Sequence, residues 1–325
     1  MNGCVDGLVR RGRAAAREPG ERDRTCESNV VRGVHGPNGT VRTAQMLVEN
    51  QASRTALMVA RFRALAAERH PSIAIDPWAP RLVDDVATVD AERYEVAHPH
   101  IVLYLALRTI AFDDEVRRAI REGVRQVVIL GAGFDTRAAR LADEGVRFFE
   151  VDHPATQAGK RARLATLPGY PADAATFVPC DFERQDFLDR LASAGHVATQ
   201  RSLVIWEGVV YYLTEDAVRA TCRRIASACH PETTLALDLV GKRFAQGRVH
   251  EEDRRAHELV AEMGEPIRFG TDDPLPMLFE CGFRHVDQRS FDELALTYTG
   301  TYVRDRKMRF QSLVRTSVAL SSAPT

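Results

Sequence analysis

Residues 127–141 read VVILGAGFDTRAARL, in which a short apolar run leads directly into a glycine-containing turn and then a helical pattern. The uninterrupted run VVIL is typical of a strand that is buried on both faces of a sheet. Gly131 and Gly133 permit a tight turn and a close approach between the backbone and a ligand. A helix that starts beside such a turn directs its free N–H groups toward an anion. Any tight strand-to-helix turn can use two glycines, so the surrounding sequence decides what this one does.

Short β-branched strands alternate with helices around this turn. The pattern predicts strands at 127–130, 146–151, 176–179, 202–206 and 233–240, separated by helices at 134–143, 154–166, 185–193 and 214–229. Continuous apolar strands that alternate with helices require a parallel sheet covered on both faces. We therefore expect a doubly wound α/β fold with a mostly parallel sheet.

Further helices and strands are expected on both sides of this alternating region. Before it, apolar spacing predicts helices at 45–69 and 100–122, and a short helix that follows the turn Asp76-Pro77-Trp78 and runs through Val86. After it, the pattern predicts helices at 250–263 and 273–281, then strands near 283–289 and 300–316. We expect these last strands to close one edge of the sheet in antiparallel orientation.

The sequence indicates one domain preceded by an amino-terminal tail. Residues 1–44 are rich in Arg, Gly, Asn and Pro, which indicates a disordered tail or a start site assigned too far upstream. They lack the apolar region of a secretory signal. Residues 45–325 are expected to form a single domain, with an amino-terminal helical cap (45–122), a core (123–240), a helical lid (241–281) and closing strands (282–325).

The composition argues against several classes of function. The 325 residues carry 44 basic and 45 acidic side chains, and this net charge of −1 argues against a nucleic-acid partner. No apolar run approaches the roughly 18 to 20 residues that cross a bilayer, so no membrane association is expected. The six cysteines form no CxxC pair and no Cys/His ligand spacing. We therefore expect no metal site and a reducing, cytoplasmic location.

An acidic residue ends the second predicted strand. Asp152 lies 21 residues after Gly131, an offset at which an acid can bind both hydroxyls of a ribose. It could instead cap the helix that begins near Pro154. Ribose binding is the interpretation that the upstream glycine turn favours.

Polar and aromatic residues also follow the third and fourth predicted strands. Asp181 could accept a hydrogen bond from the amine of an adenine while Phe182 packs on its face. Glu207 could bind an ammonium or sulfonium group, or it could serve only as a cap or turn carboxylate. A nicotinamide dinucleotide would explain the glycine turn and Asp152, but it would leave these three residues without a role, and its site usually has a smaller residue where Thr136 stands.

The set of motifs resembles the leucine carboxyl methyltransferase-like family of class I S-adenosylmethionine-dependent methyltransferases, in its small-molecule O-methyltransferase branch. The motifs are LALRTIAFDD (105–114), VVILGAGFDTRAARL (127–141), VDHPATQAGKRARL (151–164), PCDF (179–182) and LVIWEGVVYYL (203–213). The resemblance covers about residues 45–315. It implies a Rossmann-like sheet of seven strands with S-adenosylmethionine as the cofactor.

The resemblance also assigns a part of the cofactor to each of eight residues. It implies that Arg108 contacts the cofactor's carboxylate, and that Gly131, Ala132 and Gly133 hold the methionine moiety. It further implies that Asp152 holds the ribose, that Asp181 and Phe182 hold the adenine, and that Glu207 lies by the methionine portion. Lys160 matches another family position, where we expect a structural role on the outer face of its helix.

Transfer of a methyl group from a sulfonium needs alignment and the exclusion of water more than further activation. A carboxylate acceptor is ionised at pH 7 and needs no base. For an alcohol or phenol acceptor, a general base would raise the rate by about 10²- to 10⁴-fold. Tyr211 and Tyr212 are the candidate catalytic residues, although each could simply pack in the core, and His153 and His250 are further candidates.

We therefore expect O-methylation of a carboxylate or a hydroxyl on a small molecule. The candidate walls of the acceptor site are Phe62, Trp78, Phe244 and Phe269, each of which could also be ordinary packing. An NAD(P)-dependent oxidoreductase and a non-catalytic cofactor-binding domain stay open as alternatives.

Overall fold

The computed structural model describes residues 52–182, 184–247, 251–302, 309 and 311–320, without the side chains of residues 252 and 253. The predicted tail at 1–44 lies outside the described residues. All structural statements below concern the described part of the chain.

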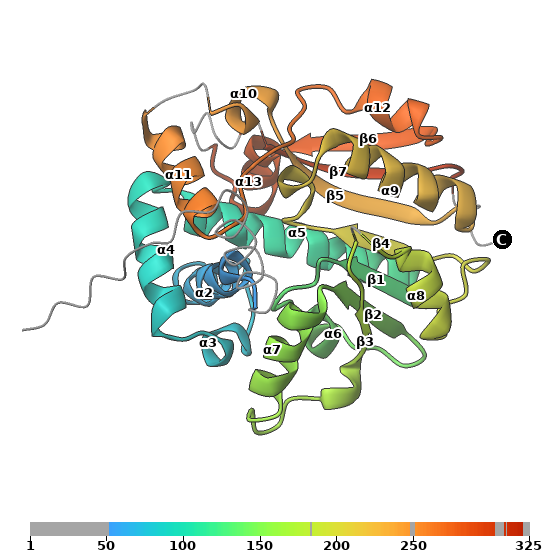
Figure 1. Ribbon diagram of the computed structural model, residues 1–325, viewed down its shortest axis with the longest axis horizontal. Helices are drawn as coiled ribbons and strands as arrows, with labels where there is room; N and C mark the ends of the chain where they lie inside the picture. Colours follow the sequence, from blue (N-terminus) through green and yellow to red (C-terminus); the bar gives the residue numbers. More distant parts are fainter. Residues whose placement is uncertain (1–51, 183, 248–250, 303–308, 310, 321–325) are drawn as a thin grey trace, which may run out of the picture. The chain divides into compact units, whose positions relative to one another are not determined.

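A seven-stranded sheet lies at the centre of the fold (Figure 1). Its strands are β1 (Gln126–Leu130), β2 (Arg147–Asp152), β3 (Ala175–Pro179), β4 (Leu203–Trp206), β5 (Thr234–Val240), β6 (His285–Ser290) and β7 (Gln311–Ser317). Their order across the sheet is β3-β2-β1-β4-β5-β7-β6. β1 to β5 pair in parallel, and β7 is antiparallel to both β5 and β6. The predicted doubly wound, mostly parallel α/β fold is confirmed.

The chain changes direction across the sheet between β1 and β4, and in open α/β sheets ligands bind outside the carboxyl ends of the strands at such a point. Leu130 pairs with Val151, and Ile129 pairs with Ile205, in parallel register. The loops after β1, β2 and β4 therefore leave the sheet at the same edge. This edge is where the sequence places its glycine turn and its acids.

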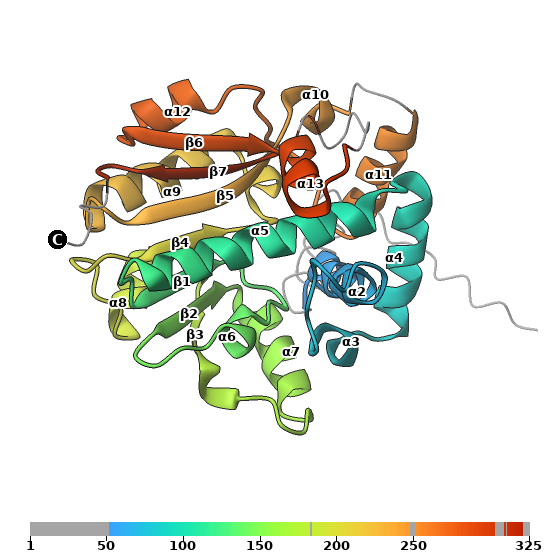
Figure 2. The ribbon, with the colours of Figure 1, turned by 180° about the vertical axis from the view of Figure 1, so that it is seen from behind.

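Helices cover both faces of the sheet. They are α2 (Arg54–Arg69), α3 (Ala79–Leu82), α4 (Asp85–Ala97), α5 (Ile101–Arg121), α6 (Arg137–Arg140), α7 (Pro154–Leu164), α8 (Phe187–Ser193), α9 (Glu215–Ala228), α10 (Lys242–Ala245), α11 (Glu251–Glu262), α12 (Leu275–Glu280) and α13 (Phe291–Thr299), with 3₁₀ turns η1 (Ala172–Ala174) and η2 (Val210–Tyr212). Figure 2 shows α5 along one face of the sheet, whereas α8 and α9 lie on the other face in Figure 1.

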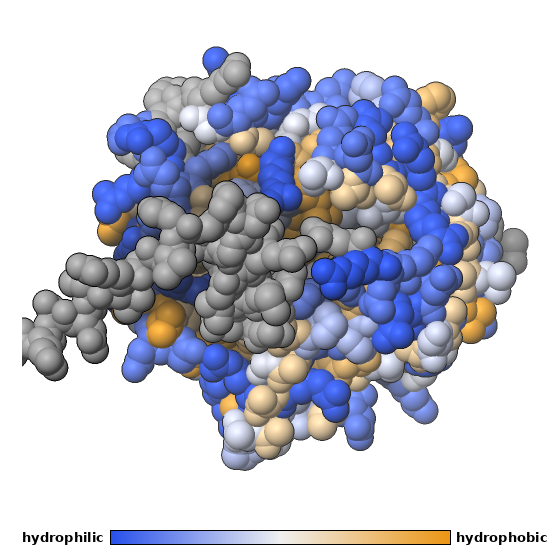
Figure 3. All heavy atoms as spheres, viewed as in Figure 1, coloured by the Kyte–Doolittle hydropathy of each residue, from blue (hydrophilic) through white to orange (hydrophobic). Residues whose placement is uncertain are grey.

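Alternate residues of β1 point into two separate apolar cores, as the period of two in a strand requires. Val127 and Ile129 pack in the core that contains α2 and α5, and Val128 and Leu130 pack in the core that contains α8 and α9. On the face shown in Figure 3, hydrophilic residues predominate over the described surface. None of the described helices combines the length and the apolar character that a bilayer-spanning segment needs.

Several element boundaries differ from the sequence-based expectation. α6 has only four residues, and the helix after Trp78 ends at Leu82, where a separate helix, α4, follows. The strand expected at 300–316 begins only at Gln311. Before it lies α13, which the periodicity did not predict although its capping box, Ser290 with Glu293, is a readable start signal.

Lys160 is fully buried, which contradicts its expected place on an outer helix face. Its ammonium nitrogen lies 2.5 Å from Glu150 Oε2 and donates to the carbonyl oxygen of Asp135, also at 2.5 Å. Lys160 therefore joins α7 to β2 and to the loop after β1. Burial raises the pKa of Glu150 to about 7, although the nearby Lys160 acts to lower it.

Replacing Lys160 with methionine leaves the buried Glu150 carboxylate unpaired. We expect the free energy of unfolding, measured by chemical denaturation at pH 8, to fall by about 3 to 5 kcal/mol. Burial makes the pKa of Glu150 higher in the folded state, so its ionisation lowers stability as the pH rises, and the removal of Lys160, which acts to lower this pKa, enlarges that effect. The loss is therefore smaller at pH 5. Adding Glu150→Gln should recover most of the loss at pH 8, and a double variant no more stable than Lys160→Met would contradict this pairing.

Candidate functional site

The glycine turn after β1 is closed by Asp152 from the end of β2. Asp152 Oδ2 accepts a hydrogen bond from the backbone N–H of Gly133, and its Oδ1 accepts from the N–H of His153 at 2.6 Å. The cap of α7 is His153, whose Nδ1 accepts from Ala155, so Asp152 does not cap this helix. Burial raises the pKa of Asp152, while its two backbone hydrogen bonds act to lower it.

Position 131 requires a glycine, both because of its backbone conformation and because a neighbouring side chain lies close to it. Its φ is +65°, in the left-handed region, and a Cβ at this position would overlap the side chain of Val209 in the loop after β4. Gly133 also has a positive φ, of +49°, and lies against Ala56 of α2. Side chains at positions 131 and 133 would therefore press against the loop after β4 and against α2.

Thr136 also has a specific partner in the fold. It is fully buried, and its hydroxyl donates to Asp76 Oδ2 at 2.8 Å. The other carboxylate oxygen of Asp76 accepts from the backbone N–H groups of Trp78 and Ala79, which confirms the predicted turn at this point. Thr136 thus connects the glycine turn to the segment before α3.

Six buried side chains of alternating charge form a continuous series beneath this edge of the sheet, which we call the charge chain. In order, its members are Arg140, Asp113, Arg137, Glu207, Arg108 and Asp238. From Asp113 onward, the closest nitrogen–oxygen distances are 2.8, 2.5, 2.8 and 3.3 Å. The charge chain joins α5 and α6 to the ends of β4 and β5.

Glu207 lies in the middle of the charge chain, between two guanidinium groups. Its Oε1 accepts from Arg108 Nε at 2.8 Å, and its Oε2 lies 2.5 Å from Arg137 Nη1. Arg108 also contacts Asp238, whose other oxygen accepts from the N–H of Gly208 at 2.7 Å. Glu207 is therefore held between two arginines rather than serving as a turn carboxylate.

Arg137 and Asp238 are two members of the charge chain that the sequence analysis did not single out. Asp238 is a lone acid in the apolar run of β5, and this was a readable signal, because a buried charge needs a partner. Arg137 stands in the quoted motif, but no spacing rule distinguishes it from the nearby Arg140. Its contacts come from tertiary structure.

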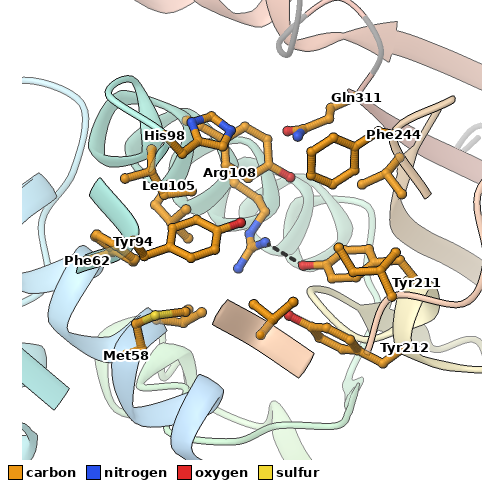
Figure 4. Close-up of a pocket in the computed structure, with 16 residues that line it drawn as sticks. Met58, Phe62, Tyr94, His98, Leu105, Arg108, Tyr211, Tyr212, Phe244 and Gln311 are labelled. Carbon is orange, nitrogen blue, oxygen red and sulfur yellow. Dashed lines mark hydrogen bonds between the residues drawn. The ribbon is translucent and has the colours of Figure 1, made fainter. Parts of the chain in front are cut away.

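A cavity of about 50 Å³ lies beside the charge chain, with Arg108 in its wall (Figure 4). Helices α2, α4 and α5 line one side, and η2, the end of β5, α10 and α11 line the other. The lining residues are Met58, Val59, Phe62, Tyr94, His98, Ile101, Tyr104, Leu105, Arg108, Tyr211, Tyr212, Val240, Phe244, Val260, Ile267 and Gln311. This described lining includes one guanidinium group and no carboxylate.

Both candidate catalytic tyrosines lie in the cavity wall. The Tyr211 hydroxyl accepts from Arg108 Nη1 at 3.3 Å, and the rings of Tyr211 and Tyr212 contact edge to face at 4.6 Å. Burial raises the pKa of both hydroxyls, and the neighbouring Arg108 does not offset this effect. The two tyrosines are therefore protonated at neutral pH.

The other predicted site residues lie in different places. Asp181 forms a 3.5 Å ion pair with Arg184 after β3, and Phe182, 36% exposed, lies 6.3 Å from Phe187. The cavity does not include these residues. His153 serves as a helix cap, and His250 lies outside the described residues.

Two of the four candidate acceptor walls take part in the cavity. Phe62 and Phe244 line it. Trp78 instead packs edge to face on Tyr170 at 5.0 Å, and Phe269 is buried in the core beneath α9 and α12. Tyr94 and His98, which stack at 6.1 Å, were not predicted as walls.

Comparisons with known proteins agree with this fold. The family described as leucine carboxyl methyltransferase matches residues 56–226. A protein of Mycolicibacterium vanbaalenii is 32% identical over 248 residues, covering 71% of this chain and 78% of the relative. One of Streptomyces coelicolor is 39% identical over 213 residues, covering 60% and 73%. Both relatives carry the provisional name S-adenosyl-L-methionine-dependent methyltransferase.

Two solved structures share the fold at low sequence identity. A DUF574 family protein from Streptomyces avermitilis has a TM-score of 0.60 and 16% identity, covering 84% of this chain and all of its own. A protein from Thermobifida fusca, provisionally titled a methyltransferase, has a TM-score of 0.54 and 14% identity, covering 72% and 89%.

The fold and these matches define a class I S-adenosylmethionine-dependent methyltransferase. Within that class, the chain belongs to the leucine carboxyl methyltransferase family. The matches do not support the NAD(P)-dependent oxidoreductase alternative.

The charges at the site fit S-adenosylmethionine. Together with Asp135, which contacts Arg137 at 2.6 Å, the described charge chain has four carboxylates and three guanidinium groups. The carboxylates therefore outnumber the guanidinium groups by one, which leaves a net negative charge. The cofactor is a net cation, with a sulfonium, an ammonium and one carboxylate. Gly131 and Gly133, beside this surplus, leave the backbone free of side chains. The residues present therefore suit the cofactor in charge and in shape.

Replacing Gly131 with alanine should destabilise the protein more than the same change at Gly145. Both glycines have a positive φ, +65° and +74°, so both variants lose about 1 to 2 kcal/mol from backbone strain. A Cβ at Gly145 meets no atom within 4 Å, whereas one at Gly131 overlaps Val209, and such overpacking costs about 1 to 3 kcal/mol more. Chemical denaturation measures the difference. The extra loss in Gly131→Ala relative to Gly145→Ala should disappear when Val209→Ala is added to Gly131→Ala. Equal losses in Gly131→Ala and Gly145→Ala would refute the steric argument.

Proposed function

We propose that this methyltransferase transfers a methyl group to an oxygen atom of a small molecule, and that this oxygen belongs to a carboxylate. The observation that carries the proposal is the wall of the cavity, where Arg108 stands among neutral hydrogen-bond donors and the described lining has no carboxylate. Such a wall offers hydrogen-bond donors to the oxygens of an anion and, in its described lining, no carboxylate that would repel it. A hydroxyl acceptor is the second candidate, because the same wall includes His98, and histidine is the residue type that most often serves as a general base.

We also propose that the eight residues named by the resemblance hold the cofactor. The carboxyl edge of the sheet supports this for the set from β1, β2, β4 and α5, which lies together there: Gly131, Ala132, Gly133, Asp152, Glu207 and Arg108. Asp181 and Phe182 follow β3, the strand next to β2, where an adenine could lie beyond the ribose. The half-exposed Phe182 ring is available for stacking.

The cofactor supplies a methyl group that is already activated by a sulfonium. The residues of the chain then have to bind and orient the acceptor and to exclude water, and such orientation accounts for up to roughly 7 to 11 kcal/mol of a barrier. In the proposed mechanism the protonated Tyr211 and Tyr212 orient the oxygens of the acceptor's carboxylate, and Arg108 lies beside them in the cavity wall. A carboxylate is ionised at pH 7, so no general base takes part.

The proposed division of the domain follows from the same wall. Met58 and Tyr94 come from the helical cap at 45–122, and Phe244 and Val260 come from the lid at 241–281. We propose that these two segments select the acceptor, whereas the core at 123–240 holds the cofactor. The cytoplasmic location expected from the cysteines stays a prediction.

Asp152→Ala should weaken the binding of S-adenosylmethionine by about 1 to 3 kcal/mol, or about 5- to 150-fold in Kd, because the variant loses the ribose acceptor and unpairs two backbone N–H groups. Isothermal titration calorimetry measures this effect. Asp189→Ala, whose side chain is 79% exposed on α8, is the matched control and should bind as the wild type does. An unchanged affinity in Asp152→Ala would remove the ribose assignment.

Incubating the protein with tritiated S-adenosylmethionine and a small-molecule extract should give a product whose label is released as methanol by mild base. Methyl esters release methanol under these conditions, whereas methyl ethers do not. Base-stable label would show that the acceptor is a hydroxyl and would contradict the carboxylate proposal. A complete lack of product with any acceptor would favour the alternative of a non-catalytic domain.

With the acceptor identified in this way, Tyr211→Phe should lower kcat/KM by less than about tenfold, because an orienting hydrogen bond is lost but no base is removed. The rate should be flat between pH 6 and 9, because burial raises the pKa of Tyr211 above this range. Steady-state kinetics across this range are the measurement. A loss of about 10²- to 10⁴-fold would show that Tyr211 acts as a general base instead.

A further inference from the structure

Arg137 contacts three carboxylates from three different parts of the fold. Its Nε donates to Asp113 Oδ1 of α5 at 2.8 Å, and its Nη1 donates to Asp135 Oδ2 at 2.6 Å. The same Nη1 lies 2.5 Å from Glu207 Oε2 at the end of β4. The side chain is 1% exposed, so no solvent replaces these contacts. Burial acts to lower the pKa of Arg137, but the three carboxylates more than offset this, so the group is a permanent cation.

The second cation on α6 differs in one respect. Arg140 is also buried, at 6% exposure, and it shares Asp113 with Arg137. Its other contacts are with Asp76, Thr136 and the carbonyl oxygen of Ile75. None of these contacts involves Glu207, which pairs with Arg137 and Arg108 instead. The two arginines thus have matched burial and one common partner, but only Arg137 reaches Glu207.

We propose that Arg137 is a positioning residue that fixes the Glu207 carboxylate for cofactor binding. This inference rests on the proposed role of Glu207 beside the methionine portion of the cofactor. Asp113 and Asp135 hold the guanidinium of Arg137 from two sides, so its direction is set before any ligand arrives. Arg137 and Arg108 then hold one oxygen each of Glu207. Arg137 does not have to touch the ligand to act.

A lysine at position 137 would keep the charge but lose the planar fork. Its single ammonium cannot reproduce contacts through Nε and Nη1 to carboxylates on α5, on the loop after β1 and on β4 at once. Glu207 would then be held by Arg108 alone and would shift toward it. The expected consequence is weaker binding of S-adenosylmethionine in a protein that still folds.

The test is a double-variant cycle on the Kd of S-adenosylmethionine, measured by calorimetry on the full chain. We expect Arg137→Lys and Glu207→Gln each to weaken binding by about tenfold or more. The combined variant should bind within about twofold of Glu207→Gln alone, because Arg137 acts through Glu207 and the losses are not additive. Arg140→Lys should stay within about twofold of the wild type. If Arg137→Lys does not fold, Arg137→Met/Asp135→Asn, which keeps the local net charge, takes its place.

The outcomes separate this inference from the function on which it rests. If Glu207→Gln binds as the wild type does, the proposed role of Glu207 fails, and the inference fails with it. If Glu207→Gln weakens binding but Arg137→Lys does not, only the inference is overturned. Additive losses in the combined variant, or equal losses in Arg137→Lys and Arg140→Lys, would show that Arg137 merely supports the fold, and these results would overturn the inference as well.

Discussion

The site depends on the charge chain that runs beneath the carboxyl edge of the sheet. Three arginines and three carboxylates alternate from α6 to the end of β5, each in contact with its neighbours. Taking such groups out of water is costly, so each one is tolerated only while its partners stay in place. Removing one member leaves a buried charge without compensation. The charge chain therefore fixes the relative positions of α5, α6, β4 and β5, and so the shape of the site.

This constraint explains why the proposed cofactor site can be acidic although its carboxylates are buried. Asp135 adds a fourth carboxylate to the chain, and Asp152 lies nearby with its oxygens on the N–H groups of Gly133 and His153. Burial raises the pKa of Asp152 and of Asp238. A bound cation would lower the cost of keeping these groups ionised. The binding of a net-cationic cofactor and the ionisation of the site should therefore support each other.

The sequence predicts the fold well because the alternation of apolar strands and helices is a local signal. It also brings Gly131, Asp152 and Glu207 to one edge, since parallel strands end together there. It does not reveal what each acid contacts. Arg108 and Glu207 are 99 residues apart, and whether Glu207 faces a ligand or an arginine depends on how α5 packs against the sheet. The same holds for Arg137, whose partners lie on three elements, whereas the capping box of α13 was a local signal that periodicity alone overlooks.

Arg108 belongs to both the charge chain and the wall of the cavity, and so under the proposed function it links cofactor binding to acceptor binding. Its Nε contacts Glu207, while its Nη1 contacts Asp238 and the Tyr211 hydroxyl at the cavity wall. Under the proposed function, a cationic donor and an anionic acceptor meet at this arginine and become two neutral products. A reaction that removes charge is favoured when water is excluded, because its transition state needs less solvation than its reactants do. Helices α2, α4 and α11 supply side chains such as Met58, Phe62 and Val260 to the cavity wall, and apolar groups of this kind would reduce the access of water to a bound acceptor.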